Sequence, residues 1–146
     1  MIQEIRHLGE LLGIILPHQF RRAGLHFLTA EDSTQQLGYM MHPKGMVISP
    51  HVHNPVPREV HYTMEVLFIK RGRVRIDFYS KSQEYLESRI LETGDVILLA
   101  MGGHGFEVLE ELEMIEVKQG PYAGNLDKTR FNGITSDQAR FADQKE

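Results

Sequence analysis

Two histidines, His51 and His53, are the first of several side chains in this sequence whose types and spacing suit metal binding. Successive side chains of a β-strand alternate faces, so imidazoles two residues apart project from one face and reach the same ion. Glu65 opens a second apolar run, and His104 follows a third. Three imidazoles and a carboxylate suit a first-row transition metal. The sequence therefore predicts one divalent ion, Zn, Mn, Fe or Ni, bound by His51, His53, Glu65 and His104.

The position of Glu65 within its apolar run supports this assignment. Glu65 shares strand parity with Leu67 and Ile69, which places its carboxylate on an apolar face. An unpaired carboxylate is costly there, and a metal ion would satisfy it. Glu59 and His61 lie nearer to the histidine pair and remain alternative donors.

The order and spacing of these residues resemble the first motif of the cupin superfamily. Gly45, five residues, His51, one residue, His53, then Glu65, six residues and Gly72 follow that pattern. Eleven residues separate His53 from Glu65, more than the motif usually has.

A second cupin motif is matched by Gly94, Gly102 and His104, with Ala100 in place of proline and the histidine one residue early. The resemblance spans residues 45 to 118. The run EVKQGPY also resembles small cupin metalloproteins of bacterial surface-polysaccharide gene clusters.

Strand-like runs punctuated by glycine and turn residues predict an all-β sandwich or barrel. The resemblance narrows this to a double-stranded β-helix, or jelly roll. We expect an N-terminal extension over 1–23, a barrel over 24–120 and a polar C-terminal tail over 121–146. Met1 to Leu8 has helical spacing, and Leu11 to Leu16 reads as a strand.

Two further expectations concern the strands after the metal motif. Residues 64–71 and 73–79 read as two strands joined by a turn at Gly72. In the second strand Val74, Ile76 and Phe78 alternate with charged residues, whose face is expected to be solvated.

Composition limits the classes of function. A chain of 146 residues that is 41% hydrophobic suits one domain with one core. A net charge of -4 without a basic block argues against nucleic acid as partner, and the absence of cysteine excludes thiolate chemistry. Without a leader pattern or a membrane-length apolar run, the sequence predicts a cytoplasmic protein that does not bind membranes.

The resemblance implies a metal-dependent cupin acting on a small polar molecule, a sugar or hydroxy acid, by an isomerase-like or epimerase-like reaction. An Fe-dependent dioxygenase and a ligand-binding or sensing cupin without turnover are the alternatives. His61, Tyr62 and Lys118 are the candidate catalytic acids or bases. Arg58 and His61 are candidate substrate-binding residues, since their loop joins two predicted ligands.

A homodimer is the predicted assembly. The apolar run from Leu11 to Leu16 needs cover, and pairing with a second subunit or packing on its own sheet would each supply it. Small cupins commonly pair through such N-terminal strands.

Overall fold

The computed structural model describes residues 1–142, whose regular elements are eight β-strands and two single-turn 3-10 helices. The strands are β1 Gln3–His7, β2 Glu10–Leu16, β3 Gly24–Phe27, β4 Gly38–Met41, β5 Glu65–Tyr79, β6 Tyr85–Glu92, β7 Val96–Leu99 and β8 Gly103–Lys118. The helices are η1 Gly124–Leu126 and η2 Ser136–Gln138. The predicted all-β class is confirmed. No helix among the described residues is long and apolar enough to cross a membrane.

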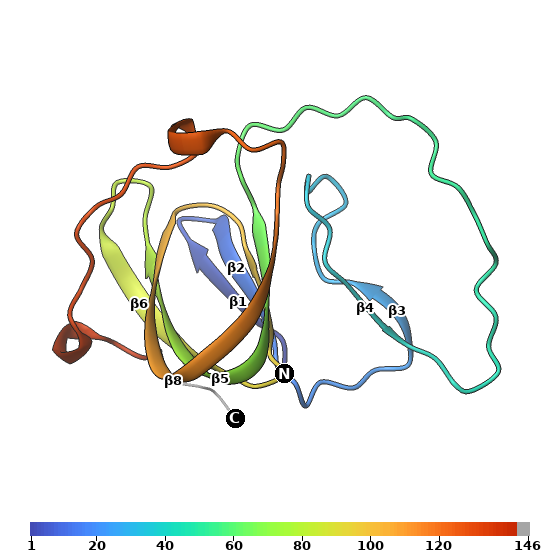
Figure 1. Ribbon diagram of the computed structural model, residues 1–146, viewed down its shortest axis with the longest axis horizontal. Helices are drawn as coiled ribbons and strands as arrows, with labels where there is room; N and C mark the ends of the chain where they lie inside the picture. Colours follow the sequence, from blue (N-terminus) through green and yellow to red (C-terminus); the bar gives the residue numbers. More distant parts are fainter. Residues whose placement is uncertain (143–146) are drawn as a thin grey trace.

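Six strands form one antiparallel sheet that curls into half a barrel (Figure 1). Its order is β1-β2-β7-β5-β6, and β8 pairs along the other edge of β5. The partners of β5 run from Glu65 opposite Lys118 to Tyr79 opposite Gly103. These two long strands therefore carry the sheet from one rim of the half-barrel to the other.

β5 is one strand of 15 residues, so the predicted turn at Gly72 is wrong. The pairing with β8 instead shifts register three times between Ile69 and Val74, as at β-bulges. Gly72 lies among these shifts with φ +96. The irregularities move the inward-facing positions from Leu67 and Ile69 to Val74, Ile76 and Phe78, all at most 1% exposed. Because β5 bends there, its first part pairs with β7 and its second part pairs with β6.

The main core fills the concave face of this sheet. It joins inward residues of five strands, led by Ile15, Leu67, Ile76, Leu91 and Ile97. A smaller cluster on the opposite face contains Ile14 and Leu98, covered by Leu37 and Leu28 next to the β3–β4 hairpin. This hairpin therefore packs outside the half-barrel and does not line it, as Figure 1 shows.

The predicted strand from Leu11 to Leu16 is confirmed as β2, whereas the helical reading of Met1 to Leu8 is wrong. β1 pairs with β2, and β2 pairs with β7. Residues Leu12 to Leu16 are buried within the chain itself. The apolar side chains of β2 are thus buried by the sheet of the same chain, and residues 3–16 belong to the half-barrel.

Residues 42–64, which we call the arm, join β4 to β5 as an extended segment (Figure 1). Nearly all of its side chains are exposed. It contains His51 and His53, and the expectation that these two lie on a strand is wrong within this chain. The physical reason is that no strand among residues 1–142 supplies the arm with ladder hydrogen bonds.

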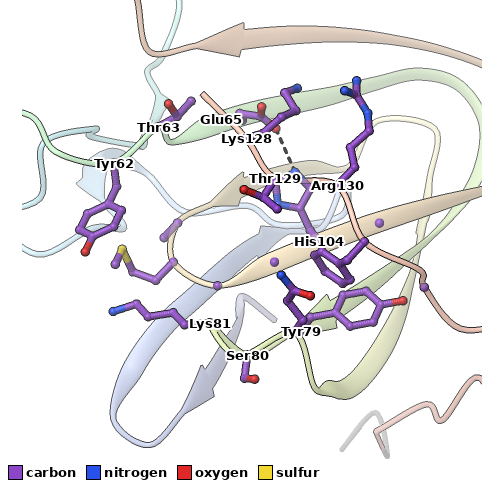
Figure 2. Close-up of a pocket in the computed structure, with 18 of the residues that line it drawn as sticks. Tyr62, Thr63, Glu65, Tyr79, Ser80, Lys81, His104, Lys128, Thr129 and Arg130 are labelled. Carbon is purple, nitrogen blue, oxygen red and sulfur yellow. Dashed lines mark ion pairs between the residues drawn. The ribbon is translucent and has the colours of Figure 1, made fainter. Parts of the chain in front are cut away.

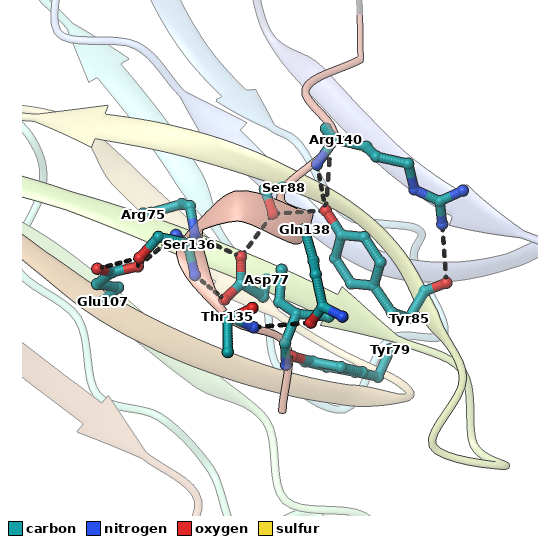
Figure 3. A network of polar contacts seen from close by, with 11 residues as sticks. Arg75, Asp77, Tyr79, Tyr85, Ser88, Glu107, Thr135, Ser136, Gln138 and Arg140 are labelled. Atoms are coloured by element: carbon teal, nitrogen blue, oxygen red, sulfur yellow. Dashed lines mark hydrogen bonds and ion pairs between the residues drawn. The ribbon is translucent and has the colours of Figure 1, made fainter. Parts of the chain in front are cut away.

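The expectation of a solvated charged face on β5 is wrong for Arg75 and Asp77, whereas the Arg73 side chain is 42% exposed. Arg75 and Asp77 are each only 4% exposed, because the chain from Ile134 to Phe141 crosses the outer face of β5 and β6. The Arg75 guanidinium donates to both Asp77 oxygens at 2.8 and 2.9 Å. Ser88 donates to Asp77 at 2.5 Å (Figure 3). The buried charges are thereby paired, as burial requires.

The C-terminal segment is fixed by hydrogen bonds to this face. The Ile134 amide donates to the Tyr79 hydroxyl at 3.0 Å, and the Arg140 amide donates to the Tyr85 hydroxyl at 2.7 Å. Ser136 donates to Glu107, which also pairs with Arg75 (Figure 3). The part of the predicted tail (121–146) from Ile134 to Phe141 is therefore packed on the sheet, and the last four residues of the tail lie outside the described residues.

Candidate functional site

Glu65 and His104 meet at one rim of the half-barrel. Glu65 Oε2 lies 3.2 Å from His104 Nε2, with side chains 12% and 31% exposed. Glu65 is the first residue of β5 and pairs with Leu99, the last residue of β7. The short connection after Leu99 then leads into β8, whose second residue is His104. This turn brings the two side chains together although they lie near opposite ends of the β5–β8 ladder.

The electrostatic surroundings favour an ionised Glu65. The hydrogen bond from His104 lowers the pKa of Glu65, partial burial opposes this, and the charges of His104, Lys118 and Lys128 lower it further. A carboxyl whose pKa is lowered by folding stabilises the fold above its unfolded pKa, and that contribution is lost as the pH falls through the folded value. At neutral pH Glu65 is therefore an ionised carboxylate that faces the imidazole of His104.

A partly open pocket of about 750 Å³ surrounds this pair (Figure 2). Residues 127–131, which we call the strap, form one side of it, and the end of β5 with its following turn forms the opposite side. Phe131 of the strap packs edge-on against Tyr79, with ring centroids 5.1 Å apart. The volume is in the range of small-molecule sites.

The structure does not bring His51 and His53 to this pocket. Their rings stack edge-on at 5.2 Å on the exposed arm, and His51 Nδ1 lies 3.0 Å from the Ser49 carbonyl oxygen. Among residues 1–142 no group of three or more His, Asp or Glu side chains lies close enough to hold a metal ion. A single chain therefore joins two of the four predicted ligands.

The predicted catalytic and substrate-binding residues also separate. Arg58 is exposed on the arm, and His61 lies 3.2 Å from Glu59, both exposed. Tyr62 lines the pocket, with its ring 5.6 Å from Lys81 Nζ. Lys118, at the end of β8, lies 3.7 Å from Asp127. Tyr62 is thus the predicted acid or base that the pocket includes.

Sequence reasoning missed the charged residues of the strap. Asp127 accepts a hydrogen bond from Thr63, which lowers the pKa of Asp127. Lys128 and Arg130 line the pocket and, within the described residues, form no ion pair with a carboxylate. The cluster DKTR was visible in the sequence, but a stretch without periodicity gives no indication of what it packs against.

Comparisons with protein-family models, with curated proteins and with solved structures found no match for this chain.

The donor chemistry at the pocket fits part of a metal site. An ionised carboxylate and an imidazole nitrogen are ligands of first-row divalent metals, and here the Glu65 side chain is largely shielded from water and the His104 side chain partly so. A stable mononuclear site takes further protein donors. Glu65 and His104 are therefore the residues of the pocket that would hold such an ion, which would supply Lewis-acid chemistry there.

Proposed function

We propose that this chain is a cupin-type metal-binding protein that acts on a small polar molecule, a sugar acid or similar hydroxy acid, in the manner of an isomerase or epimerase. The observation that carries the proposal is the convergence of Glu65 and His104 in the pocket. These residues come from two separate motifs, and the spacing of those motifs predicts both residues as ligands of one ion. The curled all-β sheet is consistent with this class of fold.

The pocket charges favour an anionic substrate. Lys81, Lys128 and Arg130 line it. Lys81 has a close carboxylate, Glu10 at 2.5 Å, whereas Lys128 and Arg130 form no ion pair with a carboxylate among residues 1–142. Cations without a protein counter-charge recognise carboxylate or phosphate groups. A hydroxy acid offers both a carboxylate for the strap and a hydroxyl for the metal.

A ligand-binding cupin without turnover is the second candidate. His61, the histidine proposed as an acid or base, lies on the exposed arm beside Glu59. Tyr62 is the candidate at the pocket, and its side chain is 58% exposed. Conversion of a bound sugar acid, followed by NMR, separates the enzyme from the binding protein.

Metal content provides the test of the site. Protein purified without chelator, or loaded with Zn, Mn, Fe or Ni, should carry stoichiometric metal by elemental analysis. Glu65→Gln and His104→Ala should each lose it, because each removes one ligand. His42→Ala, which removes a histidine outside the ligand set, is the control and should keep its metal. Equal metal in wild type and the Glu65 and His104 variants, or a wild type that cannot be loaded, would refute the site.

Charge recognition by the strap gives a separate prediction. Lys128→Gln or Arg130→Gln should weaken gluconate binding by about tenfold, since a hydrogen bond to a charged group contributes about 1.5–3 kcal/mol. Binding of glucose, the neutral counterpart, should change little. Calorimetric titration measures both ligands, with Arg22→Gln, an exposed cation distant in sequence, as control. Equal affinity of all variants for gluconate would show that the strap does not bind the carboxylate.

A further inference from the structure

β8 presents a long edge to which a strand can be added. Over its 16 residues it is hydrogen-bonded to β5, and nothing else in residues 1–142 pairs with it. On the concave side, Phe106 and Val108 lie opposite the buried Ile76 and Val74, yet they are 40% and 58% exposed. An edge of this length with exposed apolar neighbours invites pairing with another segment. The half-barrel thus ends where its core is still partly uncovered.

The arm has exposed apolar side chains and no partner strand within the described part of this chain. Met46, Val47, Ile48 and Val52 are between 53% and 85% exposed. Its backbone makes a turn bond from the Met46 amide to the Pro43 carbonyl at 3.3 Å, but no ladder to a strand among residues 1–142. Extended apolar chain with unpaired amides is poorly stable alone in water, because its side chains and backbone gain nothing from order. Pairing of the arm with the free edge of β8 would therefore bury apolar side chains and satisfy backbone groups of both segments.

Length, charge and proline positions fit residues 45–53 to that edge. Nine residues of strand span about 30 Å, well within the length of β8. β8 carries five glutamates and one lysine, whereas the arm carries Lys44, Arg58 and four histidines against one glutamate. Pro50 is compatible with an outermost strand, and Pro55 and Pro57 would end it.

The course of the arm points to a second molecule. In Figure 1 the arm leaves β4, arches on the far side of the β3–β4 hairpin from the half-barrel and returns to β5. Its two ends are held within this chain, by the β3–β4 ladder and by the bond from the Gln119 amide to the Met64 carbonyl at 3.1 Å. An arm that reaches outward in this way is positioned to pair with a neighbouring copy.

We infer that two copies of this chain exchange arms: residues 45–53 of each pair with the outer edge of β8 of the other. A reciprocal exchange buries the same surfaces on both copies, which is the geometry of a two-fold dimer. This completes both half-barrels. Resting on the proposed function, the exchange also brings His51 and His53 of one copy toward Glu65 and His104 of the other, so that each metal site contains residues from both chains.

Cross-linking tests the exchange without reference to metal. The chain has no cysteine, so an engineered pair reacts alone. Val52→Cys and Val108→Cys are made separately, the two proteins are mixed by unfolding and refolding together, and a short bismaleimide is added. Arm exchange predicts a covalent dimer containing one chain of each kind, and a native mass twice 16.8 kDa by light scattering. Val52→Cys mixed with Leu8→Cys, which is 91% exposed at the β1–β2 turn, is the control and should give only background.

The double variant Val52→Cys/Val108→Cys then separates exchange from folding back. Exchange predicts cross-linked dimer, and an arm that folds onto its own β8 gives an internally linked monomer. A monomeric native mass, an internal link or no link above background would overturn the inference.

Mixed dimers test the shared site. The His104→Ala chain and the His51→Ala/His53→Ala chain carry different tags and are co-expressed, and the mixed dimer is isolated on both. Each variant alone should carry no metal. Exchange predicts one intact site in every mixed dimer, so metal returns to half of the wild-type level. No return of metal, with a wild type that binds it, would show that each site uses its own arm. A covalent mixed dimer whose wild type binds no metal would instead refute the proposed function and leave the exchange standing.

Discussion

Replacement of Asp77 by alanine is expected to lower the free energy of unfolding by about 3–5 kcal/mol, the range for removing one partner of a buried ion pair. The reason is the Arg75 guanidinium, whose side chain is 5% exposed and which donates two hydrogen bonds to the Asp77 carboxylate. Arginine is not deprotonated in proteins, so Arg75 keeps its charge in this variant, with Glu107 as its remaining partner. Urea denaturation followed by circular dichroism measures the loss.

Two further variants make this prediction specific. Glu113→Ala removes an exposed carboxylate from Lys70 and should leave the unfolding midpoint nearly unchanged, since exposed pairs contribute little. The double variant Arg75→Met/Asp77→Leu should recover much of the stability, because apolar groups of similar shape can replace a buried pair. An Asp77→Ala protein as stable as wild type would mean that the segment after Ile134 does not bury this pair in solution.

Gly72→Ala is the second change with a large expected effect. Gly72 has φ +96, and a Cβ atom there would lie 2.1 Å from the Glu111 carbonyl oxygen of β8. The left-handed conformation costs a non-glycine residue about 1–2 kcal/mol, and the forced separation of two backbones adds about 1–3 kcal/mol. We expect a total loss of about 2–5 kcal/mol in chemical denaturation.

Gly9→Ala is the matched control for the backbone conformation. Gly9 has φ +84 in the β1–β2 turn, but a Cβ there has nothing within 4 Å. It should therefore lose only the conformational part, about 1–2 kcal/mol. Equal losses at both glycines would show that β5 and β8 do not approach each other closely at Gly72.

Much of the sheet could be predicted from local pattern. Residues 11–16, 85–91 and 96–100 alternate or are continuously apolar between turn residues, and each forms a strand at nearly the predicted position. The inward orientation of Glu65 followed from its parity with Leu67 and Ile69, because a strand has a period of two. His104 follows a short turn after β7, and the motif spacing placed it beside Glu65 correctly.

Three of the failures depend on contacts between segments distant in sequence. Arg75 and Asp77 were assigned to solvent because alternation cannot reveal that residues 134–141 cover them. Lys128 and Arg130 lie in a stretch without periodicity, so their place at the pocket was hidden. His51 and His53 have strand-like spacing, but a strand needs a partner edge, and the sequence does not say which molecule supplies it.

The packing of residues 127–141 has a consequence for the order of events during synthesis. A chain leaves the ribosome from its N-terminus, so the half-barrel strands emerge before the strap and the segment that covers Arg75 and Asp77. Until then one side of the pocket is missing, and a buried ion pair of the finished protein is in contact with water. A nascent or prematurely terminated chain that ends near Lys118 would therefore have its sheet strands without a closed pocket, and ligand binding would report on completed translation.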